Sequence, residues 1–112
     1  MSMTSLSERE ITRYNRQMMV ADWGEEGQEK LKGATVFIAG MGGLGCPVSI
    51  YLAVAGVGKM RICDVDRVEL SNLNRQIHYT EEDVGQLKAE SAEARLRETN
   101  PEIDVVSFTD FI

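Results

Sequence analysis

Cysteine is scarce in this 112-residue sequence, and its two cysteines, Cys46 and Cys63, do not form a C-x-x-C pair. This spacing excludes a disulfide scaffold, and it excludes a zinc site built from cysteines of this chain. No apolar run reaches the ~18 residues needed to cross a bilayer, so we expect no membrane partner. Residues 1–7 have neither the basic nor the apolar region of a signal peptide, and we therefore expect a cytoplasmic protein.

Basic residues are in the minority, with 12 Lys and Arg against 18 Asp and Glu and a formal charge of −6. An acidic balance of this kind argues against a nucleic-acid partner. Apolar residues make up 43% of the chain, which is enough for a core and too many for a disordered protein. The length allows one domain over residues 1–112.

The first part of the chain, residues 1–33, has helical patterns. Ser7 to Glu10 matches the S-x-x-E capping box, which predicts a helix starting near Glu8. Basic positions lie on the helix face opposite its apolar positions, and they form either a solvated stripe or a binding face. A second helix is predicted from Glu25 to Lys32, ending at Gly33.

Residues 34–108 predict a β-α-β-α-β unit. A strand at 34–39, buried on both faces, is followed by a helix at 46–57, a strand at 59–64, a polar loop, a helix at 86–99 and a strand at 103–108. Crossover connections of this kind form parallel sheets. We therefore expect an α/β fold, a Rossmann-like three-layer arrangement with a three-stranded parallel sheet.

A glycine-rich loop follows the first predicted strand. Gly40, Gly42 and Gly45 fit G-x-G-x-x-G, a pattern whose backbone N–H groups bind phosphate at a helix N-terminus. Asp64 ends the second predicted strand, where an acidic side chain commonly accepts hydrogen bonds from ribose hydroxyls. The two features together favour nucleotide binding over a glycine turn without a ligand.

A long polar loop follows Asp64, where a dinucleotide-dependent dehydrogenase usually enters another helix directly. Arg75 in this loop and Lys88 near the next helix are candidates to meet a polyphosphate, since both follow the carboxyl ends of strands. The alternative for each is ordinary surface charge. A nicotinamide-dependent enzyme fits this loop poorly.

Five motifs in order and spacing resemble the ThiF/MoeB/HesA family of ATP-dependent adenylyltransferases, which are related to ubiquitin-activating enzymes. The motifs are Arg13-Tyr-Asn-Arg16-Gln, Gly40-Met-Gly-Gly-Leu-Gly45, Asp64-Val-Asp66, Ser71-Asn-Leu-Asn-Arg75-Gln76 and Val84-Gly-Gln-Leu-Lys88. The resemblance runs from Glu8 to Phe108 and implies the N-terminal half of the adenylyltransferase domain. It implies that a carrier protein's C-terminal carboxylate attacks the α-phosphate of ATP, giving an acyl-adenylate and pyrophosphate.

The resemblance also implies partners and residue roles. The carrier is a ubiquitin-like or sulfur-carrier protein, and the cofactors are ATP and Mg²⁺, with metal ligands needed from outside this chain. The expected nucleotide-binding residues are Gly40, Gly42, Gly43, Gly45, Asp64, Asp66, Ser71, Asn72, Arg75 and Lys88. The expected catalytic residues are Arg16, Arg75 and Lys88, with Arg16 reaching the γ-phosphate in the other subunit of a dimer. No metal site within the chain is expected, because Asp66 alone would hold Mg²⁺ poorly.

Several family features do not follow the third strand: a further acidic Mg²⁺ ligand, a substrate-docking region and paired zinc cysteines. We therefore expect incomplete activity from this polypeptide alone, and a homodimer or a complementing C-terminal half as its partner. The strand at 34–39 is expected to present an unpaired apolar edge, which favours association. The alternative is a non-catalytic nucleotide-binding or partner module of the same family.

Overall fold

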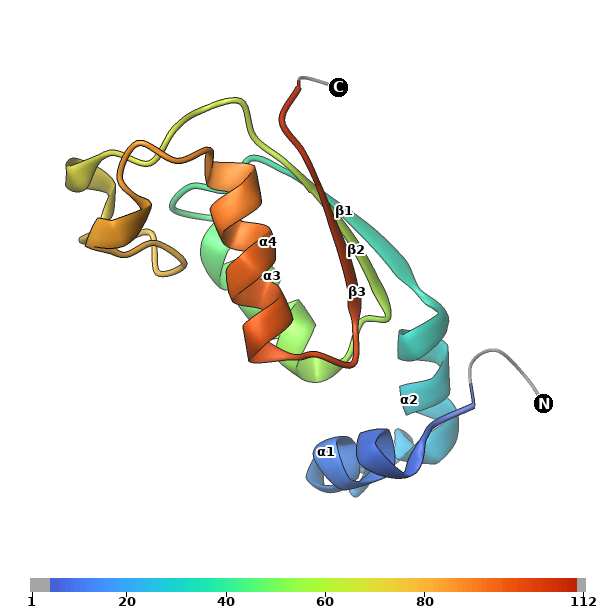
Figure 1. Ribbon diagram of the computed structural model, residues 1–112. Helices are drawn as coiled ribbons and strands as arrows, with labels where there is room; N and C mark the ends of the chain where they lie inside the picture. The colour runs from blue at the N-terminus through green and yellow to red at the C-terminus, as the bar shows by residue number, and fades with distance from the viewer. Residues whose placement is uncertain (1–4, 111–112) are drawn as a thin grey trace.

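The computed structural model describes residues 5–110, along which helices and strands alternate (Figure 1). In chain order the elements are α1 (Glu8–Met18), α2 (Gly24–Gly33), β1 (Thr35–Ala39), α3 (Gly45–Ala55), β2 (Lys59–Cys63), α4 (Lys88–Thr99) and β3 (Asp104–Phe108). The expected α/β class and the three-stranded parallel sheet are confirmed. No helix in residues 5–110 has the length and apolar character that crossing a bilayer requires.

The sheet has the order β1-β2-β3, with β2 in the centre. Met60 of β2 pairs with Val36 on one side and with Val105 on the other. The crossover helices α3 and α4 lie on the same side of the sheet (Figure 1). Residues 5–110 therefore form two layers, where the sequence suggested three. The core between the layers includes Ala53, Val57, Met60, Ile62, Ala92, Leu96 and Val105.

Strand β1 is buried on one face only. Its burial alternates along the strand, and Phe37 is 49% exposed on the side away from the helices. The Phe37 ring stacks on Phe108 of β3, with 6.4 Å between the ring centroids. The prediction of a strand buried on both faces is wrong, because both crossover helices cover the same face. Within the described residues β1 pairs with β2 alone.

The predicted capping box at the start of α1 is confirmed. Ser7 Oγ accepts from the Glu10 N–H at 3.1 Å, and Glu10 Oε1 accepts from the Ser7 N–H at 2.9 Å. Glu10 is buried and also pairs with Lys32 of α2 at 2.8 Å. The capping residue that starts α1 thus ties it to α2 as well.

Helix α1 docks where α3 and α4 end. Gln17 Nε2 donates to the carbonyl oxygen of Ala55 at 2.9 Å. The buried Asn100 side chain donates to Tyr14 Oη at 2.8 Å and to the carbonyl oxygen of Ala53 at 2.7 Å. These contacts lie at the amino ends of the strands, so α1 and α2 occupy the end of the sheet opposite the glycine loop (Figure 1).

Candidate functional site

The glycine loop, residues 40–45, leaves the carboxyl end of β1 and leads into α3. Gly40 has φ +93°, a conformation that other residues adopt at a cost, and its N–H donates to the Cys63 carbonyl at 2.8 Å. Gly45 packs directly on the Gly40 carbonyl oxygen, so a Cβ at Gly45 would overlap that oxygen. The chain's own geometry therefore requires these two glycines.

Packing within the chain does not account for the other two glycines. A Cβ at Gly43 would meet nothing within 4 Å, and one at Gly42 would reach only ordinary contact with Gln76. Neither residue has a positive φ. Helix α3 begins here without a side-chain cap and without an acidic residue in its first turn. A surface that is open at Gly43 and lies beside a helix N-terminus suits an anionic ligand.

Asp64 stands immediately after β2 and organises the carboxyl edge of the sheet. Its Oδ2 accepts from the Met41 N–H at 2.8 Å, and its Oδ1 accepts from the Asp66 N–H at 2.7 Å. The half-buried carboxylate therefore links the glycine loop to the segment after β2. Each oxygen keeps a lone pair for a further donor, such as a ribose hydroxyl.

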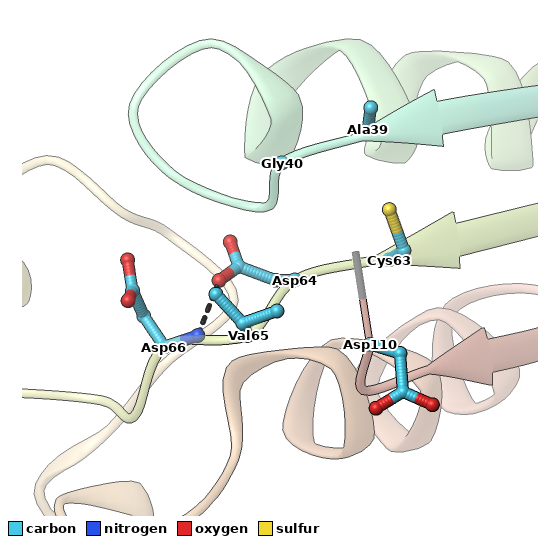
Figure 2. A pocket seen from close by; sticks show the side chains of 7 residues that line it. All are labelled: Ala39, Gly40, Cys63, Asp64, Val65, Asp66 and Asp110. Atoms are coloured by element: carbon cyan, nitrogen blue, oxygen red, sulfur yellow. Dashed lines mark hydrogen bonds between the residues drawn. The ribbon is translucent and has the colours of Figure 1, made fainter. Parts of the chain in front are cut away.

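Asp64 also lines a cavity of about 470 Å³ at the ends of β1 and β2, as Figure 2 shows. The lining residues are Ala39, Gly40, Cys63, Asp64, Val65, Asp66 and Asp110. The structure thus brings together Gly40, Asp64 and Asp66 of the predicted site. A second hollow, of about 510 Å³, is lined by α1 residues alone and lies away from this edge.

Lys88 opens α4 beside the same edge. The residue is 7% exposed, and its N–H donates to the Asp66 carbonyl at 2.9 Å. Tyr79 Oη joins the two sides of the site, donating to the Met41 carbonyl at 2.6 Å and to the Lys88 carbonyl at 3.5 Å. Lys88 forms no ion pair within residues 5–110. The described residues therefore leave the positive charge of Lys88 available to an anion that binds at this edge.

The loop between β2 and α4 carries the remaining predicted residues. Asn72 is buried, and its Oδ1 accepts from the Glu69 N–H at 2.8 Å, which shapes a short 3₁₀ turn. Arg75 is exposed and donates to the Ser71 carbonyl at 3.1 Å. The cavity at Asp64 is lined by none of the predicted loop residues Ser71, Asn72 and Arg75.

Arg16 is not part of this assembly. It is exposed near the end of α1, on the far side of the molecule from residues 40–45. Helix α3, whose 11 residues span about 16 Å, separates the two ends. Arg16 therefore does not approach the glycine loop of its own chain.

Three buried polar residues at this site, Gln76, His78 and Tyr79, were not predicted from the sequence. His78 is 2% exposed and lies 2.6 Å from Ser49 Oγ of α3, while its Nδ1 has no hydrogen-bond partner among the described residues. Burial lowers the pKa of His78 to about 4, and the charge of Arg95 acts in the same direction. Gln76 closes the Arg75 motif and His78 and Tyr79 follow it, which is the sequence signal that could have drawn attention to them.

The two cysteines have structural roles. Cys46 is fully buried, its Sγ donates to the Met41 carbonyl at 3.3 Å, and burial raises the pKa of its thiol. Cys63 is buried at the end of β2. A raised pKa keeps Cys46 in the unreactive thiol form, as expected of a residue that only packs in the core.

No group of three or more His, Cys, Asp or Glu side chains in residues 5–110 is arranged to hold a metal ion. Asp64, Asp66 and Asp110 line one cavity without forming such a group. Figure 2 shows the Asp110 carboxylate turned away from the other two. The described residues thus hold no cluster of three such side chains around one point.

Comparison with known proteins places this geometry in a family. The model of the ThiF family matches residues 14–112, which include the glycine loop, Asp64 and Lys88. The chain belongs to the ThiF family. It is 50% identical over 102 residues to a sulfur carrier protein adenylyltransferase of Thermus thermophilus, covering 91% of this chain and 38% of the relative. It is 52% identical to the adenylyltransferase and sulfurtransferase MOCS3 of Culex quinquefasciatus, covering 91% of this chain and 23% of that protein.

Solved structures of ThiF-like proteins share the fold. PaaA matches with a TM-score of 0.89 at 39% identity, covering the whole chain and 36% of PaaA. The tRNA N6-threonylcarbamoyladenosine dehydratase TcdA of E. coli, in a complex with AMP, matches with a TM-score of 0.88 at 33% identity, covering 95% of this chain and 42% of TcdA. The chain thus spans roughly a quarter to two-fifths of the length of these relatives.

Proposed function

We propose that this chain is the nucleotide-binding part of an ATP-dependent adenylyltransferase that activates the C-terminal carboxylate of a ubiquitin-like or sulfur-carrier protein. The supporting observation is Lys88, a residue only 7% exposed whose side chain has no ion-pair partner in residues 5–110, at the edge that also holds the glycine loop and Asp64. A polyphosphate would supply the missing negative charge. A relative named sulfur carrier protein adenylyltransferase and a TcdA complex with AMP support the same reading.

In this proposal each group of the site has a separate task. Asp64 accepts from the ribose hydroxyls, while the N–H groups at the start of α3 and the Lys88 ammonium group bind phosphate oxygens. The carrier carboxylate attacks the α-phosphorus, a new C–O–P linkage forms, and the bond to the β-phosphate breaks with release of pyrophosphate. The fixed cations and N–H groups stabilise the charge on the departing pyrophosphate.

Arg75 would bind phosphate only after it exchanges its present hydrogen-bond partners, and Asn72 would keep the shape of the loop. Both side chains form hydrogen bonds within their own loop, to the Ser71 carbonyl and the Glu69 N–H. Arg75 is exposed and its present acceptors are weak compared with a phosphate. We infer that Arg75 turns toward the polyphosphate on binding, and that Asn72 together with Ser71 shapes the loop that presents it.

We further propose a homodimer in which Arg16 serves the site of the other copy. This follows from the distance between α1 and the glycine loop within one chain. The half-exposed Phe37 on β1 offers an apolar contact surface. Light scattering over a concentration series should show a mass above that of the monomer, as expected of an interface that buries more than ~1,000 Å². A monomer at tens of micromolar, unchanged in solubility by Phe37→Lys, would refute the association. Cytoplasmic localisation stays a prediction.

The second candidate is a non-catalytic nucleotide-binding module that acts with another chain. The observation that favours it is the lack of a metal-binding group among the described residues. ATP–pyrophosphate exchange with candidate carrier proteins, measured with and without a complementing C-terminal half, separates the two. Exchange that appears when that half is added supports the enzyme, whereas nucleotide binding without exchange in either case supports the module.

Calorimetric titration with ATP tests the proposed site. Lys88→Met should weaken ATP binding by about 1.5–3 kcal/mol, the contribution of a charged hydrogen bond, and Asp64→Asn by about 1–3 kcal/mol. Lys30→Met removes the same charge from an exposed position on α2 and serves as the control. Tighter binding of NADH than of ATP, or Lys88→Met equal to the control, would refute the proposal.

A further inference from the structure

Gln76 lies buried against the glycine loop with an unsatisfied amide oxygen. The residue is 4% exposed, and its Oε1 is fully buried without a hydrogen-bond partner in residues 5–110. Its Nε2 lies 3.7 Å from the position that a Cβ on Gly42 would occupy. The side chain therefore lies directly beside the part of the loop that packing leaves open.

The backbone around Gln76 holds this amide in place. Its N–H donates to the Asn72 carbonyl at 2.9 Å, and its carbonyl accepts from the Tyr79 N–H at 3.2 Å. Tyr79 in turn is bound to the carbonyl of Met41 in the glycine loop. The segment that follows Gln76 is thus fixed to the glycine loop through Tyr79.

A buried amide oxygen without a donor carries a cost. An unsatisfied polar group of this kind loses about 1–3 kcal/mol of hydration, which a leucine or methionine of similar volume would avoid. Residues 5–110 supply no donor for Gln76 Oε1. Tyr79 joins the Lys88 carbonyl to the Met41 carbonyl, so the start of α4 lies close to the glycine loop, and the uncapped start of α3 favours an anion.

We propose that Gln76 is a nucleotide-contacting residue, whose Nε2 donates to a phosphate oxygen between the glycine loop and the loop after β2. The inference rests on the proposed nucleotide binding and adds a contact to it. The bound group is a nucleoside phosphate, recognised through the phosphate oxygen that Nε2 reaches.

Two substitutions test this contact while keeping the side-chain size. Gln76→Met removes the donor and the acceptor, and Gln76→Glu replaces the donor with a negative charge facing phosphate. Gln86→Glu makes the same charge change at an exposed glutamine of the same loop and serves as the matched control. Circular dichroism checks the fold, and calorimetry measures the affinities for adenosine, AMP and ATP.

We expect Gln76→Met to lower AMP and ATP affinity roughly 10- to 100-fold, as for loss of a charge-assisted hydrogen bond, and Gln76→Glu to lower it further. Adenosine affinity should stay unchanged in both. Gln86→Glu should stay within about twofold of the parent.

An equal loss of adenosine and AMP binding would show that Gln76 only supports the shape of the site, and would overturn the contact. AMP affinity equal to that of the parent in folded Gln76→Met would overturn it as well. If the parent chain binds none of the three ligands, the proposed function itself fails. If the parent binds them and the variants do not differ from it, only the role of Gln76 fails.

Discussion

The only histidine of the chain should make its stability depend on pH. His78 is buried between the loop after β2 and α3, where it bonds to Ser49 Oγ at 2.6 Å. Its groove also contains the charged side chains of Glu82, Asp83, Arg95 and Glu98. Burial, followed by the repulsion of Arg95, lowers the pKa of His78 to about 4, from 6.5 in an unfolded chain.

The direction of the effect follows from proton binding. Between pH 6.5 and about 4 the unfolded chain binds a proton at His78 that the folded chain does not, so acid favours unfolding. The stabilisation is complete above pH 6.5 and is lost as the pH falls toward 4. A pKa difference of this size corresponds to about 2.5 kcal/mol of lost stability by pH 4.5.

Urea unfolding of the parent and of His78→Gln at pH 7.5 and pH 4.5 measures how much His78 contributes to the pH dependence of the free energy of unfolding. Glutamine can still donate to Ser49 Oγ but does not titrate, so it should lose about 2.5 kcal/mol less than the parent between the two pH values. Subtracting the stability loss of His78→Gln from that of the parent cancels the contributions of the acidic residues, which titrate in both proteins. Parallel losses of stability, or a His78 pKa near 6.5 in an NMR titration of the imidazole, would refute the reasoning.

Further predictions concern the two ends of the sheet. Gly45→Ala should destabilise the chain by about 2–4 kcal/mol, because its Cβ would overlap the Gly40 carbonyl oxygen. Gly43→Ala should unfold at nearly the same urea concentration as the parent but bind AMP more weakly. Equal unfolding midpoints for Gly45→Ala and Gly43→Ala would contradict the steric argument. Asn100→Ala should cost about 2–4 kcal/mol, since it leaves three hydrogen-bonding groups unpaired. Tyr14→Phe, which removes one of those bonds, should cost only about 0.5–1.5 kcal/mol in the same unfolding assay.

Local patterns in the sequence predicted most elements and part of the site. The capping box starts α1 at Glu8 as expected, because both of its hydrogen bonds join residues three positions apart. The glycine loop and Asp64 meet at the carboxyl ends of β1 and β2, since parallel strands bring their carboxyl ends to the same edge. These features depend on short-range spacing and on strand direction, which the sequence determines by itself.

Only the tertiary structure decided which face of the sheet is covered and which polar groups lack partners. Phe37 is half exposed because α3 and α4 pack on the same face, which the apolar run at 34–39 does not reveal. The sequence made Lys88 a candidate phosphate ligand and gave Gln76 no role, and only packing buries both residues and leaves Gln76 Oε1 without a donor. Burial and hydrogen-bond satisfaction depend on segments far apart in the chain, so no local pattern carries them.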